Sequence, residues 1–319
     1  MAEQREVLVV VGATGAQGGG TARAALADGR YQVRAVTRKP KSDKAQALRA
    51  AGAEIVAADL DDVESLVKAF SGAQRAFFVT NYWELYSPER ELQQAQNLAE
   101  AARRAGLQHV VWSTLEDTRT QVPLDDEARY PTLMGKYKVP HFDAKGEADQ
   151  FFIERDVPTT FLRASFYFDN FVYFGSGPKR GADGVLELIL PMGDKVMPGV
   201  AAEDIGAVAY GILLRGPELI GQTVGVAGEH LTGKQYAEKM GKALGEEVRY
   251  APVTPTQFRA FGFPGADDLG NMFQYYQDFE RELSEVRSVE RSRQLYPQLQ
   301  SFDQWLEKYA SQMPIEQAV

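Results

Sequence analysis

The 319-residue chain contains no cysteine and only three histidines. The absence of cysteine excludes disulfides, thiolate nucleophiles, iron–sulfur clusters and cysteine-based zinc sites, and it fits a reducing compartment. The histidines, His109, His141 and His230, lie far apart in the chain and show no metal-ligand spacing. We therefore expect no metal site, and any redox chemistry would have to run through a bound nicotinamide.

Long apolar runs and an excess of basic residues are also missing. No apolar stretch of about 18 residues and no charged-then-apolar leader occurs, which predicts a cytoplasmic protein with no membrane association. Acidic residues outnumber basic ones by 44 to 35, for a net charge of −9. Because duplex binding needs clustered lysine and arginine, this balance argues against a nucleic-acid partner.

The most informative feature that is present is an apolar run that ends in glycines. Val7–Val11 predict a buried parallel strand, and Gly12, Gly15 and Gly18 follow in phase, before a helix over 21–27. Strand, glycine turn and helix thus stand in the order that binds a dinucleotide. The glycines let the backbone approach a pyrophosphate, whose charge rests on the helix amino terminus. The alternative is a strand-to-helix turn with no ligand.

The end of the second expected strand, over 31–38, indicates which dinucleotide binds. Folds selective for NAD place an acidic residue about 20 residues beyond the glycines to bind the ribose hydroxyls. Here Thr37 occupies the strand tip, and Arg38 and Lys39 follow. A guanidinium binds a 2′-phosphate through paired, charge-assisted hydrogen bonds, whereas a carboxylate would repel it. We therefore predict NADP(H) as the cofactor, against the alternative of a solvated basic loop.

Strands and helices alternate along most of the chain. Strands are expected at 7–11, 31–38, 54–59, 75–80, 109–114, 159–164 and 222–227. Helices are expected at 21–27, 43–51, 63–70, 89–105, 142–154 and 202–209. This alternation predicts an α/β fold with a doubly wound parallel Rossmann sheet. A smaller, mostly helical C-terminal lobe is expected to follow it.

The same pattern suggests how the chain is divided into domains. The NADP(H)-binding Rossmann domain is expected at 1–165, with 200–228 returning to it, and the smaller substrate or partner lobe at 166–199 and 229–319. The stretch 165–197 is rich in glycine and aromatic residues and is expected to be irregular. A polar insertion at 116–140 is either a lid over the site or a mobile surface loop.

In an open parallel sheet, a ligand lies beyond the carboxyl ends of the strands. The candidate contacts at expected strand tips are Asp59, Leu60, Thr80, Asn81, Tyr82, Ser113, Thr114, Phe166, Tyr167, Phe168, Asp169 and Asn170. Asn81 and Asn170 can each donate and accept, as ribose or carboxamide contacts require, although turn formation is an equal alternative. The aromatic stretch 166–174 either stacks on a planar substrate or belongs to the core.

Ordinary short-chain dehydrogenases carry Tyr-x-x-x-Lys on one helix, where the lysine lowers the pKa of the tyrosine. The corresponding segment here runs from His141 to Lys145, so the lysine position is filled and histidine replaces tyrosine. His141 could donate a proton near neutral pH, but a histidine at a helix start is more often a surface or capping residue. Both residues are candidate catalytic groups, and Lys145 is more credible as a cofactor contact.

Several segments resemble the NmrA-like family of atypical short-chain dehydrogenases/reductases. They are 12–19, 37–40, 79–84, 141–147 and 263–266. Within the family the chain is most similar to the human type of NADP(H)-binding redox sensor. The segments Thr80–Glu84 and His141–Gly146 are specific to this resemblance, whereas the glycine motif is not.

The resemblance implies a set of cofactor contacts, carried over by motif position. They are Gly12, Ala13, Thr14, Gly15, Ala16, Gln17, Arg38, Lys39, Asp59, Leu60, Thr80, Asn81, Tyr82, Lys145, Tyr167, Phe168, Asp169 and Asn170. Gly18 and Thr37 are added from the glycine motif and the strand tip. The segment between Thr118 and Tyr137 is longer than in the sensor type, so we expect the lid and any dimer surface near it to differ.

Three functions follow as expectations. Sensor-type relatives dimerise or rearrange with the NADPH/NADP⁺ ratio and often lack dehydrogenase activity. Other relatives reduce substrates, which here implies an NADPH-dependent reductase of a quinone, enone, imine or carbonyl compound. A third group acts as corepressor-like regulators that bind a protein partner. We expect a homodimeric NADP(H)-responsive sensor, with the reductase as the alternative.

Overall fold

A computed structural model describes residues 5–84 and 86–315. Internal contacts divide the chain into two compact units. Unit 1 comprises Met1–Asp117, His141–Arg163 and Ala202–Val224, and unit 2 comprises Thr118–Pro140, Ala164–Ala201 and Gly225–Val319. Most of the expected insertion therefore groups with unit 2, while the domain division expected from the sequence stays a prediction.

Unit 1 is built on a seven-stranded sheet of order β11-β6-β5-β4-β1-β2-β3. Its strands are β1 (Val7–Val11), β2 (Gln32–Thr37), β3 (Glu54–Ala57), β4 (Arg75–Phe78), β5 (His109–Thr114), β6 (Thr159–Arg163) and β11 (Thr223–Gly225). The pairs from β6 to β3 are parallel. The expected doubly wound α/β sheet is confirmed, with every strand that the sequence predicted.

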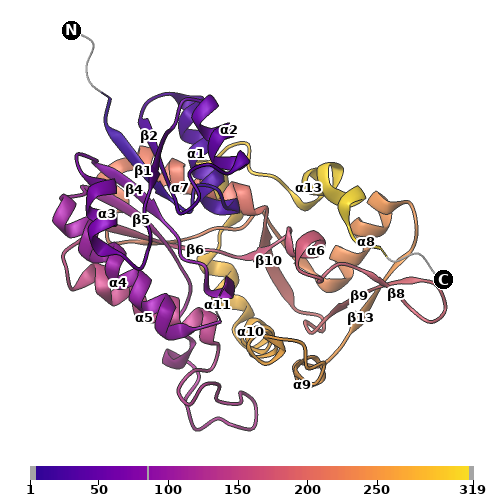
Figure 1. Cartoon of the computed structure of the whole chain (residues 1–319). Coiled ribbons are helices and arrows are strands. Elements are labelled where there is room, and N and C mark those ends of the chain that lie inside the picture. The colour runs from indigo at the N-terminus through magenta and orange to yellow at the C-terminus, as the bar shows by residue number, and fades with distance from the viewer. Residues whose placement is uncertain (1–4, 85, 316–319) are drawn as a thin grey trace. The chain divides into compact units, whose positions relative to one another are not determined.

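Helices cover both faces of this sheet (Figure 1). They are α1 (Ala16–Asp28), α2 (Asp43–Ala50), α3 (Val63–Phe70), α4 (Pro88–Ala105), α5 (Pro140–Ile153) and α7 (Ala202–Arg215). An apolar core that includes Val9, Phe78, Trp112 and Phe152 joins the sheet to α3, α4 and α5. The central strands β1, β4 and β5 are buried along most of their length, as expected for parallel strands that are covered on both faces.

The glycine turn after β1 has the geometry that its spacing predicts. Gly12 has φ +68°, in the left-handed region, and the Gly15 N–H donates to the Gly12 carbonyl over 2.9 Å. A Cβ on Gly18 would lie 2.4 Å from the Gly12 oxygen and 2.8 Å from the Val11 oxygen. Gly18 therefore permits the close approach of α1 to the end of β1.

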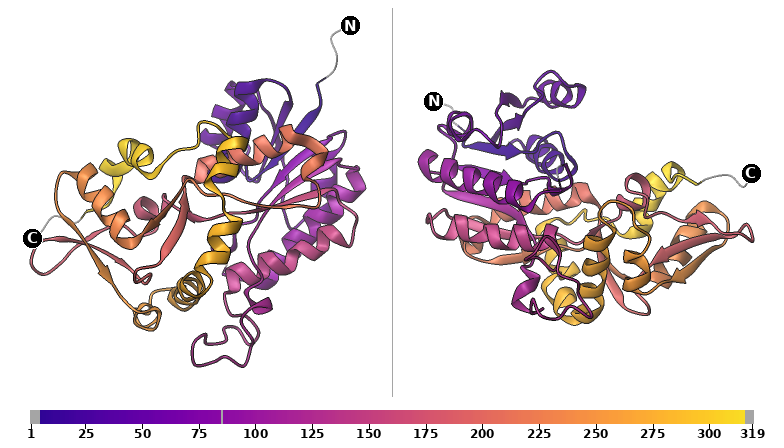
Figure 2. Two further views of the ribbon diagram at one scale, coloured as in Figure 1. Left: turned by 180° about the vertical axis from the view of Figure 1, so that it is seen from behind. Right: turned by 60° about the horizontal axis from the view of Figure 1, so that its bottom comes forward.

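A second close approach joins α1 to α7, which lie side by side (Figure 2). A Cβ on Gly206 of α7 would lie 2.0 Å from the Gln17 carbonyl oxygen, and a Cβ on Gly20 of α1 would lie 2.1 Å from the Glu203 oxygen. The Thr21 hydroxyl also donates to the Gly206 carbonyl over 3.1 Å. Two helix backbones therefore touch behind the glycine turn.

Replacing Gly206 with alanine is expected to lower the free energy of unfolding by about 2–3 kcal/mol, because the new methyl group meets backbone atoms that cannot rotate away. Gly19→Ala is the matched control. A Cβ there meets first the end of the Arg23 side chain, at 3.0 Å. Urea unfolding of both variants measures the difference, and equal stabilities would contradict this account of the helix pair.

Unit 2 carries two three-stranded sheets, of order β12-β10-β7 and β13-β9-β8. Their strands are β7 (Phe166–Tyr167), β8 (Lys179–Arg180), β9 (Leu186–Leu190), β10 (Val196–Val200), β12 (Glu229–Thr232) and β13 (Val248–Pro252). The expectation that 165–197 is irregular was wrong, since the segment holds β7, β8, β9 and the start of β10. Its strands escaped notice because two of them are only two residues long.

The remainder of unit 2 is largely helical, as expected. Its helices are α6 (Asn170–Tyr173), α8 (Gly233–Leu244), α9 (Pro255–Arg259), α10 (Ala266–Asp278), α11 (Glu280–Val286), α12 (Val289–Leu295) and α13 (Phe302–Tyr309). Phe168 is fully buried and packs against Phe302 and Trp305, with ring centroids 4.8 and 5.9 Å away. The inner part of the aromatic stretch 166–174 is therefore core.

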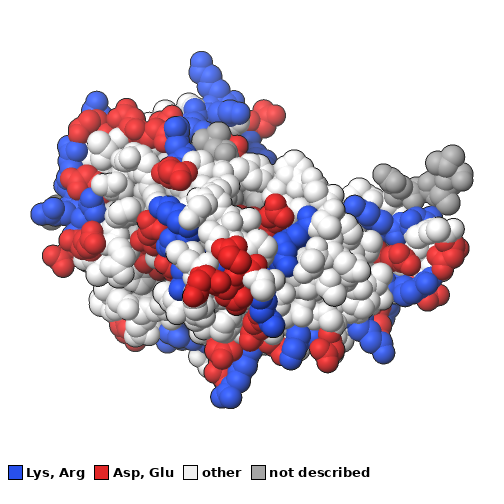
Figure 3. All heavy atoms as spheres, turned by 90° about the horizontal axis from the view of Figure 1, so that it is seen from below, with Lys and Arg blue, Asp and Glu red and all other residues white. Residues whose placement is uncertain are grey.

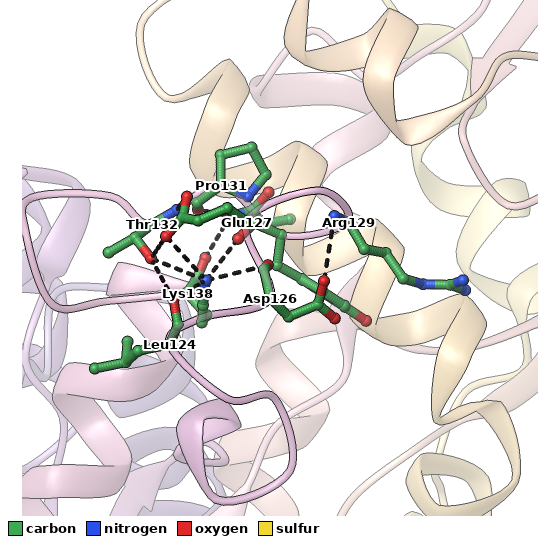
Figure 4. A network of polar contacts seen from close by, with 9 residues as sticks. Leu124, Asp126, Glu127, Arg129, Pro131, Thr132 and Lys138 are labelled. Atoms are coloured by element: carbon green, nitrogen blue, oxygen red, sulfur yellow. Dashed lines mark hydrogen bonds and ion pairs between the residues drawn. The ribbon is translucent and has the colours of Figure 1, made fainter.

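Residues 118–140, which make up most of the insertion expected at 116–140, are organised around one buried ammonium group (Figure 4). Lys138 is fully buried, and its Nζ donates to the Tyr130 carbonyl over 2.7 Å, the Thr132 hydroxyl over 2.8 Å and the Leu124 carbonyl over 3.0 Å. The Asp126 carbonyl lies 3.3 Å from the same nitrogen. The segment thus has a defined fold with little regular secondary structure.

Charges of both signs are mixed on the face of the molecule that Figure 3 shows. Acidic side chains gather near the middle of this view, and the lysine and arginine side chains scattered around them form no continuous basic surface. Within the described part of the chain, no helix combines the length and the apolar character needed to cross a bilayer.

Candidate functional site

The candidate site lies in unit 1, at the carboxyl ends of β1, β2 and β4. The glycine turn leads directly into α1, whose N-cap is Gly15. No acidic residue stands in the first turn of α1. The first amides of a helix have no intrahelical acceptor, and they carry the positive end of the helix dipole. Gly12 through Gly18 therefore form a cradle suited to an anionic group.

The tip of β2 carries a cation held by a carboxylate. Arg38 follows Thr37 and is half exposed. Its Nη2 donates to both carboxylate oxygens of Glu84, over 2.9 and 2.8 Å. The neighbouring Lys39 is exposed, and its backbone N–H donates to the Thr37 hydroxyl. Arg38 is thus positioned, as expected, beyond the strand end, with a partner that the sequence reasoning missed.

The tip of β4 carries a buried polar cluster. The Lys145 Nζ, from α5, lies 2.5 Å from the Glu91 Oε1 and 2.8 Å from the Thr80 Oγ1. It also donates to the Thr80 carbonyl over 3.3 Å, and the Thr80 hydroxyl donates to Glu91. The Glu91 side chain is 1% exposed and the Lys145 side chain 11%. Three acceptors therefore match the three N–H groups of this ammonium.

The ring of His141 lies one helical turn before Lys145, among aromatic side chains. Its centroid is 4.7 Å from that of Trp83, 5.9 Å from that of Tyr82 and 4.8 Å from that of Phe142. His141 is 6% exposed. The His141 ring therefore has a packing role, since it fills the contact between α5 and η1 (Tyr82–Glu84).

A second carboxyl group of α5 lies behind the cluster. Trp112 Nε1 donates to the Asp149 Oδ1 over 2.9 Å. Burial raises the pKa of Asp149 to about 7, against the smaller opposing effects of hydrogen bonds from Thr114 and Trp112. The Trp112 ring also lies beneath the Lys145 ammonium, with Nζ 5.3 Å from the ring centroid. Asp149 is therefore a titratable group close to Lys145 that the sequence pattern did not single out.

The remaining candidates of unit 1 lie at strand ends with ordinary local roles. Asp59 Oδ1 accepts from the Asp61 N–H, and the Leu60 carbonyl accepts from the Asn97 side chain over 2.8 Å. Asn81 is exposed, and its carbonyl accepts from the Glu84 N–H. Asp59, Leu60 and Asn81 stay predicted cofactor contacts.

The candidates of unit 2 surround the short strand β7. Tyr167 pairs with Val200 of β10, and the Phe168 N–H donates to the Val200 carbonyl. Asp169 is the N-cap of α6, which begins at Asn170. These placements show where the four residues lie within unit 2, and their role as cofactor contacts stays a prediction.

A pocket in unit 1 lies beside the Arg38–Glu84 pair. Its lining includes Arg38, Asn81, Tyr82, Glu84, Arg90 and Glu91. Glu84 and Glu91 were missed at the sequence level because each pairs with a residue about 50 positions away. Among residues 5–84 and 86–315, no group of three acidic or histidine side chains is placed to hold a metal ion.

The comparisons with known proteins agree with this architecture. The model of the NmrA-like family matches residues 4–306. An NmrA-like family domain-containing oxidoreductase, ptmS of Penicillium ochrochloron, is 28% identical over 301 residues, which cover 87% of this chain and 85% of the relative.

Two solved structures share the fold. NmrA, a negative transcriptional regulator solved in complex with NADP, superposes with a TM-score of 0.78 at 23% identity, covering 97% of this chain and 96% of its own. A triphenylmethane reductase of Citrobacter sp., solved with NADP(H), superposes with a TM-score of 0.72 at 20% identity, covering 96% and 99%. With a family model that spans nearly the whole sequence, the chain belongs to the NmrA-like family.

Proposed function

We propose that this protein binds NADP(H) in unit 1 and acts as a sensor of the NADPH/NADP⁺ ratio. The glycine cradle at Gly12–Gly18 would receive the pyrophosphate, and Arg38 would receive the 2′-phosphate. The cofactor assignment depends above all on the position of Arg38. It is a half-exposed guanidinium at the end of β2, the position where NAD-selective folds carry a carboxylate.

The wild-type protein is expected to bind NADPH more tightly than NADH, and Arg38→Met is expected to weaken NADPH binding by about tenfold to a hundredfold, since a hydrogen-bonded charge pair contributes about 1.5–3 kcal/mol. The affinity for NADH should change by less than about twofold. Calorimetric titration measures both affinities. Arg104→Met is the control, because Arg104 forms a comparable exposed pair with Glu64. Equal loss of both cofactors would contradict the assignment.

The sensor role is supported by the chemistry around α5. The three donors of Lys145 face Thr80 and Glu91, and the tyrosine position one turn earlier holds His141, which packs among aromatic rings. A group that already satisfies its partners is poorly placed to move a proton during turnover. This arrangement favours binding and regulation over catalysis.

A sensor must bind the two redox forms with different affinity, or the two forms must stabilise different assemblies. Titration with NADPH and NADP⁺, together with light scattering to follow the expected homodimer, tests this requirement. Equal affinities with no change in assembly would rule the sensor out. The same proposal includes a regulatory protein partner that binds one of the two states of the sensor.

The second candidate is an NADPH-dependent reductase of a quinone, enone, imine or carbonyl compound. It is favoured by the oxidoreductase name of the relative from P. ochrochloron and by the fold shared with the Citrobacter reductase. Steady NADPH oxidation by the pure protein with a panel of small quinones would support it. No turnover across that panel would argue for the sensor.

A further inference from the structure

The Arg38–Glu84 pair spans the end of strand β1. Arg38 follows β2, and Glu84 ends η1, which follows β4. In the sheet, β1 lies between β4 and β2. The two side chains therefore approach each other from the strands on either side of the one that leads into the glycine turn. Their contact crosses the place where a dinucleotide would lie.

The Glu84 carboxylate occupies Arg38 in the way that a bound anion would. One guanidinium nitrogen of Arg38 lies between the two carboxylate oxygens of Glu84, at 2.9 and 2.8 Å. A phosphate would present paired oxygens to the same nitrogen in the same way. The Glu84 side chain is 43% exposed and that of Arg38 53%, so both remain accessible to an incoming ligand.

The carboxylate is held in place by the turn that carries it. Tyr82, at the start of η1, is 3% exposed, and its ring lies 5.3 Å from that of Trp83, measured between centroids. Thr80, just before the turn, is bound by Lys145. The Glu84 N–H donates to the Asn81 carbonyl. The backbone at Glu84 is therefore anchored to the end of β4.

We propose that Glu84 is a built-in competitor for the 2′-phosphate of the cofactor and sets the selectivity between NADPH and NADH. The inference rests on the proposed function, since it requires that Arg38 receive this phosphate. The phosphate has to displace the Glu84 carboxylate from Arg38 and then remain near it. A 2′-phosphate carries a charge of about −1.5 to −2, so both effects weaken its binding. NADH carries no phosphate at this position and escapes both effects.

The test is calorimetric titration of wild-type protein and Glu84→Gln with NADPH and NADH. The variant should bind NADPH about three- to tenfold more tightly, a range set by the loss of one exposed ion pair and the removal of a nearby like charge. NADH affinity should change by less than about twofold. Glu64→Gln is the control, because Glu64 forms a similar two-oxygen pair with Arg104. It should alter neither affinity.

A second comparison separates competition for Arg38 from a general effect of charge. In the Arg38→Met background, Glu84→Gln should raise NADPH affinity by less than it does in the wild-type background, because no guanidinium remains to compete for and only the repulsion between the carboxylate and the phosphate is removed. A gain as large as in the wild-type background would overturn the mechanism of competition.

The outcomes for the inference and for the proposed function are distinct. If wild-type protein prefers NADPH but Glu84→Gln binds it no more tightly, the role of Glu84 is overturned and the cofactor assignment stands. If wild-type protein prefers NADH, the assignment of the 2′-phosphate to Arg38 is overturned, and the role of Glu84 with it.

Discussion

Replacing Lys145 with methionine is expected to lower the free energy of unfolding by about 3–5 kcal/mol, because it leaves the buried carboxylate of Glu91 without its counter-charge. The Glu91 side chain is almost fully buried and has Lys145 at 2.5 Å. Thr80 loses a donor to its hydroxyl and its carbonyl in the same variant. Urea unfolding followed by circular dichroism measures the loss.

A double variant distinguishes the cost of leaving the Glu91 carboxylate unpaired from the cost of losing the lysine side chain alone. Lys145→Met combined with Glu91→Leu removes both charges, so the double variant should be more stable than Lys145→Met by about 1–3 kcal/mol. Lys44→Met, at an exposed position of α2 in the same unit, is the control and should change stability by less than about 0.5 kcal/mol. A Lys145→Met variant as stable as the Lys44→Met variant would contradict the buried pair.

Replacing Asp149 with asparagine is expected to stabilise the protein increasingly as the pH rises from about 4 to about 7. The pKa of Asp149 is about 7 in the folded chain, against an ordinary value of 3.8 for an aspartate side chain. Between these values the folded state holds a proton that the unfolded state has lost, so the wild-type free energy of unfolding falls with pH. Asparagine does not titrate, and its amide oxygen can still accept from Trp112. The stability difference between variant and wild type should therefore grow by up to about 4 kcal/mol.

The comparison has to be made between variants because another buried group titrates with the opposite sign. Burial lowers the pKa of His109 to about 4, with the charge of Arg75 acting in the same direction. Its contribution makes the wild-type stability rise with pH between about 4 and 6.5. Urea unfolding of wild type, Asp149→Asn and the exposed control Asp43→Asn at several pH values isolates the Asp149 contribution. A difference that does not depend on pH would disprove the raised pKa.

The sheet of unit 1 could be predicted from sequence because its signals are local. A buried strand such as β1 is a continuous apolar run, and the glycines at 12, 15 and 18 follow it within one turn. The backbone geometry of that turn depends on the missing Cβ atoms of these same residues. The sequence pattern and the structural cause are thus only a few residues apart.

The parts that escaped prediction depend on partners far along the chain. Strand β7 has two residues and is held by β10, more than thirty positions later. Glu91 faces Lys145 across 54 positions, and Glu84 faces Arg38 across 46. No spacing rule relates such residues, since only the folded chain brings them together. Arg38 and Lys145 were recognised as candidates, while the carboxylates that hold them were not.

The buried ammonium of Lys138 organises the segment 118–140 as a bound cation would, but it is covalently part of the chain. Loops shaped by a dissolved cation lose their form when a chelator or a change in ionic conditions removes that cation. Here the coordinating oxygens, among them those of Leu124, Tyr130 and Thr132, surround a charge that cannot diffuse away. The cation that holds this segment therefore cannot be removed by a chelator or by a change in ionic conditions.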